Sequence, residues 1–220
     1  MISEQIAALH SQLPAGVTLV AVSKYHPVAA LLQAYEAGQR VFGESHVQEL
    51  VAKQALMPAD VQWHFIGHLQ TNKVKYIAPF VSLIHAVDSL RLLREIDKQA
   101  GRCGRRIDCL LELHLAQEET KYGFTPDELT ALLDSDEWAT LPHVRIRGLM
   151  TMATYTDDTE QIRREFRTAH DLYQYARDHV AAASHWDMLS MGMSHDYPVA
   201  IEEGATLVRI GTSIFGQRQY

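Results

Sequence analysis

The stretch LSMGMSHDYPVAIEEGATLVRIGT, residues 189–212, shows the strand–helix–strand pattern from which the fold is predicted. The apolar run Trp186–Leu189 leads into this stretch, and a second apolar run, Leu207–Ile210, lies near its end. A helical pattern that extends through Glu203 separates the two runs. Near-continuous apolar runs are typical of parallel strands that helices cover on both faces. The stretch therefore predicts two parallel strands joined by a helix.

The same alternation recurs along the whole chain. Strands are predicted at Val17–Val22, Arg40–Phe42, Val61–Phe65, Val81–Ala86, Ile107–Leu113, Val144–Leu149, Trp186–Leu189 and Leu207–Ile210. Helices are predicted at Ser3–Gln12, Val28–Ala37, Pro126–Asp134 and Glu160–Ala183. Eight strands that alternate with helices favour an α/β fold, a single (β/α)8 TIM-type barrel over residues 1–220 with an extra N-terminal helix. A doubly wound open sheet is the alternative.

The composition is that of an ordinary globular protein, with 47% hydrophobic and 21% charged residues and no linker-like tract. The net charge of −7, from 20 basic and 27 acidic residues, argues against nucleic acid as a partner. The two cysteines, Cys103 and Cys109, are expected to be free thiols. No signal peptide or membrane-length apolar run is present, so we expect a cytoplasmic protein with no membrane partner.

A lysine follows the first predicted strand directly, in VAVSK at residues 20–24. In a barrel of this type the active groups lie at the carboxyl ends of the strands. An amine in a partly desolvated barrel mouth can acquire a lowered pKa and form an imine with an aldehyde. On this feature alone, a surface lysine that extends into solvent is the stronger interpretation.

Small and hydroxylated residues follow the seventh and eighth strands. Gly192 would let the backbone approach a ligand, and Ser194 is placed to cap the following helix, whose free N–H groups attract an anion. Gly211 and Thr212 would add a backbone N–H and a hydroxyl. Barrels often hold a phosphate between these two loops, so the residues together predict a phosphate site. Ordinary helix capping is the alternative.

Three further side chains have two interpretations each. Arg209 lies in an apolar strand, so it either pairs with an acid across the barrel or contacts a ligand. Met193 either forms part of the wall of the ligand site or packs in the core. His64 and His68 are four residues apart, but no companion ligands have the spacing of a zinc site, so we predict no metal. His64 is expected at the barrel mouth or packed as an ordinary histidine.

Seven stretches resemble the YggS/PROSC family, the pyridoxal phosphate homeostasis proteins. They are AVSKYHP at 21–27, FGESHVQEL at 42–50, WHFIGHLQTNK at 63–73, HAVDSLRL at 85–92, EETKYGF at 118–124, RGLMTMA at 147–153 and LSMGMSHDYPVAIEEGATLVRIGTSIFG at 189–216. The resemblance implies a barrel similar to the N-terminal domain of alanine racemase. One departure is that Ser45 and His46 stand where the family often has asparagine and tyrosine.

The resemblance also assigns the site. It implies pyridoxal 5′-phosphate (PLP) as cofactor, held as a covalent imine on Lys24. Ser194, Gly211 and Thr212 match the phosphate-binding positions, and Arg209 matches an arginine near the pyridine nitrogen. Such an arginine disfavours protonation of that nitrogen, which makes the cofactor a poor electron sink.

We therefore expect a monomeric PLP carrier that acts in vitamin B6 homeostasis, with PLP-dependent apoenzymes as possible partners and without catalytic turnover. A PLP-dependent racemase is the first alternative; it is disfavoured because no second domain follows residue 216 to supply an opposing acid. A sugar-phosphate barrel enzyme or an interaction scaffold would bind no coloured cofactor, so the visible spectrum separates these alternatives.

Overall fold

Eight parallel strands form a closed barrel in the computed structural model, which describes residues 1–116, 122–135 and 137–216. Each strand pairs with the next in chain order, and β8 pairs with β1, where Val20 lies beside Arg209. The strands are β1 Thr18–Val22, β2 Val41–Glu44, β3 Gln62–Phe65, β4 Leu83–Val87, β5 Ile107–His114, β6 Val144–Met152, β7 Met188–Met193 and β8 Leu207–Ile210. The predicted (β/α)8 barrel is confirmed, and the open-sheet alternative is wrong because the first and last strands pair.

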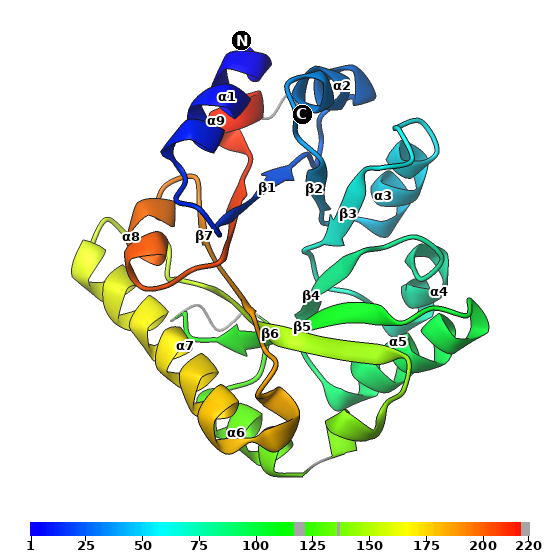
Figure 1. The fold of residues 1–220 in the computed structure, drawn as a ribbon, viewed down its shortest axis with the longest axis vertical. Coiled ribbons are helices and arrows are strands. Elements are labelled where there is room, and N and C mark those ends of the chain that lie inside the picture. Colours follow the sequence, from blue (N-terminus) through cyan, green and yellow to red (C-terminus); the bar gives the residue numbers. More distant parts are fainter. Residues whose placement is uncertain (117–121, 136, 217–220) are drawn as a thin grey trace.

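Helices surround the ring of strands (Figure 1). The α-helices are α1 Ile2–Gln12, α2 Val28–Glu36, α3 Val47–Gln54, α4 Val74–Ile77, α5 Leu90–Arg102, α6 Pro126–Asp134, α7 Thr159–His179, α8 Tyr197–Glu202 and α9 Thr212–Phe215, and short 3-10 turns lie at Thr71–Lys73, Glu137–Thr140 and Ala181–Ala183. Helix α1 is the predicted extra element, and it packs against α2 and α9. Thr125 caps α6 by accepting the Glu128 N–H.

Apolar side chains fill both sides of the strands. A small cluster inside the barrel contains Val20, Leu83, Leu110, Met150 and Leu207. A larger cluster lies between the strands and the outer helices. Because both faces of each strand are covered, the strands read as near-continuous apolar runs in the sequence.

The unit around β7 differs from its prediction. The strand begins at Met188 and continues through Gly192 to Met193, whereas Trp186 precedes it as a buried core residue. The following helix is correspondingly short, since α8 begins only at Tyr197. The predicted helix Glu160–Ala183 also ends early, because α7 stops at His179 and a separate 3-10 turn follows.

Cys103 and Cys109 are both free, as expected. Among the described helices, none is long and apolar enough to cross a membrane. Residues 118–121, which belong to the matched stretch 118–124, lie outside the described part of the chain.

Candidate functional site

A cavity of about 520 Å³ opens at the carboxyl ends of the strands. This volume is in the range of small-molecule and cofactor sites. All six predicted site residues line it, namely Lys24, Met193, Ser194, Arg209, Gly211 and Thr212. The structure therefore brings together residues from the ends of β1, β7 and β8, although their contacts with a cofactor stay a prediction.

Lys24 follows β1 directly and is half-buried at the cavity wall. Ser23, the residue before it, is fully buried. Tyr25, the residue after it, has a φ of 67°, in the left-handed region that non-glycine residues rarely adopt. A buried residue and a sharp backbone turn thus fix where the lysine side chain leaves the strand.

The loops after β7 and β8 contact each other at the predicted phosphate position. The Gly211 N–H donates to Ser194 Oγ over 3.4 Å, and Thr212 is the next residue in the chain. Ser194 does not cap the following helix, so that prediction is wrong: the cap position belongs to Asp196, whose carboxylate accepts the Met193 N–H. Hence the Ser194 hydroxyl faces the loop after β8 instead of the start of α8.

Gly192 has a different role from the one predicted. Its φ is 92°, and a Cβ there would lie 2.6 Å from the Cβ of Ala200 in α8. The space that the glycine leaves is thus filled by the helix, and the close approach is between β7 and α8. Met191 is fully buried in the core, whereas Met193 lines the cavity.

Arg209 is 4% exposed and forms the inner end of the cavity. Its guanidinium donates to Ser190 Oγ over 2.5 Å and to the Thr151 carbonyl over 2.8 Å. Burial lowers the pKa of Arg209 to about 10, while the charges of Asp196 and Glu112 oppose this shift. The group is therefore still a cation at neutral pH, and among the described contacts its hydrogen-bond acceptors are uncharged.

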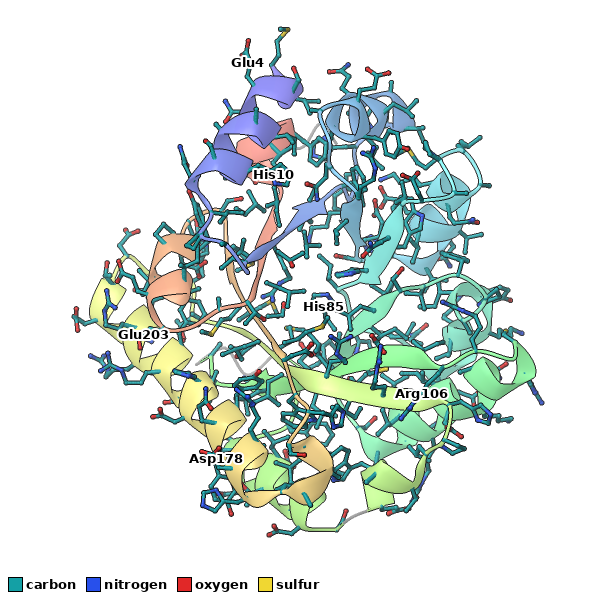
Figure 2. All side chains as sticks on the ribbon, viewed as in Figure 1. Glu4, His10, His85, Arg106, Asp178 and Glu203 are labelled. Atoms are coloured by element: carbon teal, nitrogen blue, oxygen red, sulfur yellow. The ribbon has the colours of Figure 1, made fainter. Side chains whose placement is uncertain are left out.

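A chain of polar groups continues from Arg209 through the barrel interior. Ser190 Oγ lies 2.9 Å from His85 Nδ1, and His85 Nε2 lies 3.0 Å from His64 Nδ1. Figure 2 shows His85 inside the ring of strands. Burial lowers the pKa of His64 to about 3, and burial lowers the pKa of His85 well below its usual value. Both rings are therefore neutral, and of the two interpretations of His64 the structure favours the packed histidine, since its ring is buried against His85.

Glu112 of β5 is also buried, and its Oε2 atom has no hydrogen-bond partner among the described residues. Burial raises the pKa of Glu112 to about 7, with Asp88 adding to the shift and Arg209 opposing it. This carboxyl group can therefore change its charge near neutral pH.

No group of three or more His, Cys, Asp or Glu residues that could hold a metal ion occurs within residues 1–116, 122–135 and 137–216. Asn72 and Lys73, at the end of the matched stretch 63–73, line two other hollows on the surface.

The sequence analysis missed several residues of the cavity wall. His26 comes from the loop after β1, and Tyr155 and His195 come from the loops after β6 and β7. Ser45, noted only as a departure from the family pattern, lines the cavity as well, whereas His46 precedes α3 at its N-cap position. A position shortly after a strand end is the only signal that these residues share in the sequence.

A closed parallel barrel with a lysine, two hydroxyls and a buried arginine in one cavity at its carboxyl end defines a ligand-binding (β/α)8 barrel of the TIM type. The chain belongs to the family of the alanine racemase N-terminal domain, whose model matches residues 1–219. Among curated relatives, the pyridoxal phosphate homeostasis protein of Aquifex aeolicus is 45% identical over 204 residues, which cover 92% of this chain and 87% of that protein. The protein of the same name from Escherichia coli is 38% identical over 211 residues, covering 94% and 88% of the two chains. The resemblance to this family is thus confirmed.

Solved structures agree with this assignment. PipY of Synechococcus elongatus with PLP bound is 41% identical, with a TM-score of 0.91 over 98% of this chain and 100% of that chain. Alanine racemase of Clostridium difficile is 13% identical, with a TM-score of 0.75 over 100% of this chain and 57% of that chain. The second similarity shows the fold alone.

Proposed function

We propose that this protein binds PLP as an imine on Lys24 and acts as a PLP carrier in vitamin B6 homeostasis. The observation that carries the proposal is the presence, in one cavity, of an amine, two hydroxyls with a backbone N–H, and a guanidinium. When bound, PLP supplies an aldehyde carbon, a phosphate group and a ring that can accept electrons. The PLP-bound state of PipY and the names of the curated relatives support the same cofactor.

The residues of the cavity suit the three parts of this molecule. Lys24 would hold the aldehyde carbon. The Ser194 and Thr212 hydroxyls would hold the phosphate, and the Gly211 N–H would exchange its long contact with Ser194 Oγ for a phosphate oxygen, because such groups donate hydrogen bonds to anions. Arg209, at the inner end of the cavity, would lie beside the ring nitrogen, and Met193 would contact the ring from the wall.

The carrier role makes further claims about this chain. We propose that it works in the cytoplasm as a monomer, delivers PLP to PLP-dependent apoenzymes, and has no catalytic turnover of its own. The names of its relatives support a role in homeostasis.

The Lys24→Ala variant tests the cofactor and its anchor together. We expect purified parent protein loaded with PLP to show a visible imine absorbance, and borohydride reduction to attach the cofactor to a peptide that contains Lys24. The variant should lose both signals because no other lysine lines the cavity among the described residues. A variant with an unchanged spectrum and an unchanged reduced adduct would show that another residue is the anchor.

A further inference from the structure

A buried ion cluster lies directly behind the loop that carries Lys24. Its members are Glu44 at the end of β2 and the two residues Glu49 and Lys53 of α3. The Lys53 side chain is only 7% exposed and the Glu44 side chain is fully buried. None of the three lines the cavity of the candidate site.

Every donor of the Lys53 ammonium group has an acceptor. Lys53 Nζ lies 2.7 Å from Glu44 Oε1, 2.6 Å from Glu49 Oε1 and 2.7 Å from the carbonyl oxygen of Ser23. The Ser23 hydroxyl donates to the same Glu44 oxygen over 2.6 Å. Since an ammonium group has three donors, the cluster uses all of them, and one of them fixes the backbone of Ser23.

The residue on the other side of Lys24 is fixed by the same cluster. The Tyr25 N–H donates to Glu49 Oε1 over 2.6 Å. Tyr25 also has the positive φ of 67°, a conformation that costs free energy in a non-glycine residue and persists only where neighbouring groups hold it. The carbonyl before Lys24 and the N–H after it are therefore both tied to charged side chains of α3.

A purely stabilising role does not account for this arrangement. Removing charged groups from water is costly, and well-packed apolar residues of similar volume often stabilise a protein at least as well as a buried ion pair. What apolar residues cannot do is hold a carbonyl and an N–H in fixed positions. The cluster directs these two contacts at the two residues that flank the cavity lysine.

We propose that Lys53 and Glu49 are positioning residues that orient the Lys24 amine for imine formation with PLP. This inference rests on the proposed function, since it assumes that Lys24 is the anchor. Lys53 fixes the backbone before the amine, and Glu49 fixes the backbone after it. Neither residue lines the cavity, so both would act through the direction in which the Lys24 side chain enters it.

The test compares Glu49→Ala with Glu49→Gln. The alanine variant loses the acceptor for the Tyr25 N–H and for Lys53, whereas glutamine keeps an oxygen that can accept from both. Apo-protein is mixed with PLP, the rise of the imine absorbance is followed, and the borohydride-trapped adduct on Lys24 is quantified. We expect Glu49→Ala to slow imine formation about ten-fold or more, because an ångström-scale displacement can cost up to about a hundred-fold in rate. Glu49→Gln should restore most of the rate.

A second variant addresses Lys53 without leaving the fully buried Glu44 carboxylate unpaired. Lys53→Met combined with Glu44→Gln removes the cation and the buried anion together, and it should also slow imine formation. Asp108→Asn is the matched control, because Asp108, near the amino end of β5, pairs with Arg145 and Arg147 of β6, away from the cavity at the carboxyl ends of the strands. Thermal unfolding of each variant checks that the protein is folded under the conditions in which the rate of imine formation is measured.

The outcomes separate this inference from the proposed function. If the parent protein is trapped at Lys24 and the folded Glu49→Ala and Lys53→Met/Glu44→Gln variants form the imine at the parent rate, the positioning role is overturned and the function stands. A slowing of the same size in Asp108→Asn would also overturn it, because a general loss of stability would then explain the effect. A parent protein that is not trapped at Lys24 overturns both proposals.

Discussion

Ser194 and Thr212 are the residues for which the proposed phosphate site makes the most direct prediction. Each hydroxyl would donate one hydrogen bond to the phosphate dianion, and hydrogen bonds to charged groups contribute roughly 1.5–3 kcal/mol. Ser194→Ala and Thr212→Val should therefore each weaken cofactor retention about ten- to a hundred-fold without preventing imine formation. Dialysis against phosphate buffer, with the visible spectrum followed over time, measures retention. Retention equal to that of the parent would place the phosphate elsewhere.

Glu112 and the two interior histidines respond to pH in opposite directions. The folded-state pKa of His64 is lowered to about 3, so the unfolded chain binds a proton first and stability falls as the pH drops below about 6.5. Glu112 has a folded-state pKa raised from 4.5 to about 7. Its contribution is therefore fully present below pH 4.5 and is lost as the pH rises through about 7.

The Glu112→Gln variant isolates the second effect. Glutamine has the shape of the protonated acid but cannot ionise, so it avoids the cost of a buried carboxylate. Between pH 4.5 and 7 the free energy of unfolding of the variant should rise relative to the parent by roughly 3 kcal/mol, from 1.36 kcal/mol for each pKa unit. Urea denaturation at several pH values measures this difference, with the exposed Glu36→Gln as control. A difference that does not change with pH would mean that Glu112 is not neutral in the folded protein.

At the level of elements, the segment from β7 to α8 shows what the sequence could and could not predict. The apolar run before Ser190 and the apolar run of β8 predicted the two strands. Ser194 is a common capping residue type, yet the turn at 194–196 moves the helix start to Tyr197, because the Asp196 carboxylate binds the Met193 N–H. Ser194 and Asp196 are close in sequence, but their spacing does not reveal which of them occupies the N-cap position of α8.

Helix α3 shows a second kind of limit. Its buried positions are Val47, Leu50 and Lys53, so a lysine occupies the core-facing stripe of the helix. That irregularity is visible in the sequence and is the signal that could have identified the cluster. Its partners were not predictable, however, because Ser23 and Glu44 come from other elements and meet Lys53 only when β1 and β2 pair.

For the molecule as a whole, the sequence predicted the number of strands and their closure because each strand is covered by helices on one face and by the barrel interior on the other. The polar chain inside the barrel was not predicted. It joins His64 of β3, His85 of β4, Ser190 of β7 and Arg209 of β8, which are far apart in sequence. Since single buried polar residues in different strands carry no common pattern, their contact follows only from the closed barrel.

The chain of polar groups from His64 to Arg209 limits the reactions that a bound cofactor could undergo in this barrel. Ser190 accepts from Arg209 and contacts His85, so the guanidinium is held in place at the inner end of the cavity. Its pKa of about 10 leaves it charged at neutral pH. A cation beside the ring nitrogen opposes protonation of that nitrogen. Without the protonated ring, PLP draws electrons weakly from a bound amino acid.

We therefore expect PLP-loaded protein to show negligible racemase, transaminase and decarboxylase turnover with common amino acids. An arginine beside the ring nitrogen does not by itself prevent racemisation. The reaction also needs a second acid, on the face of the substrate's α-carbon opposite Lys24 and within hydrogen-bond reach, about 2.6–3.2 Å, of the proton that it transfers. Tyr155 lines the cavity, with its ring edge-on to that of His195, and is the tyrosine placed to be tested as such an acid. Chiral chromatography of L-alanine incubated with the protein measures racemisation, and PLP-treated Lys24→Ala protein is the control. Turnover at ordinary enzyme rates that disappears in this variant would contradict the carrier role, and its loss in Tyr155→Phe would identify the tyrosine as the second acid.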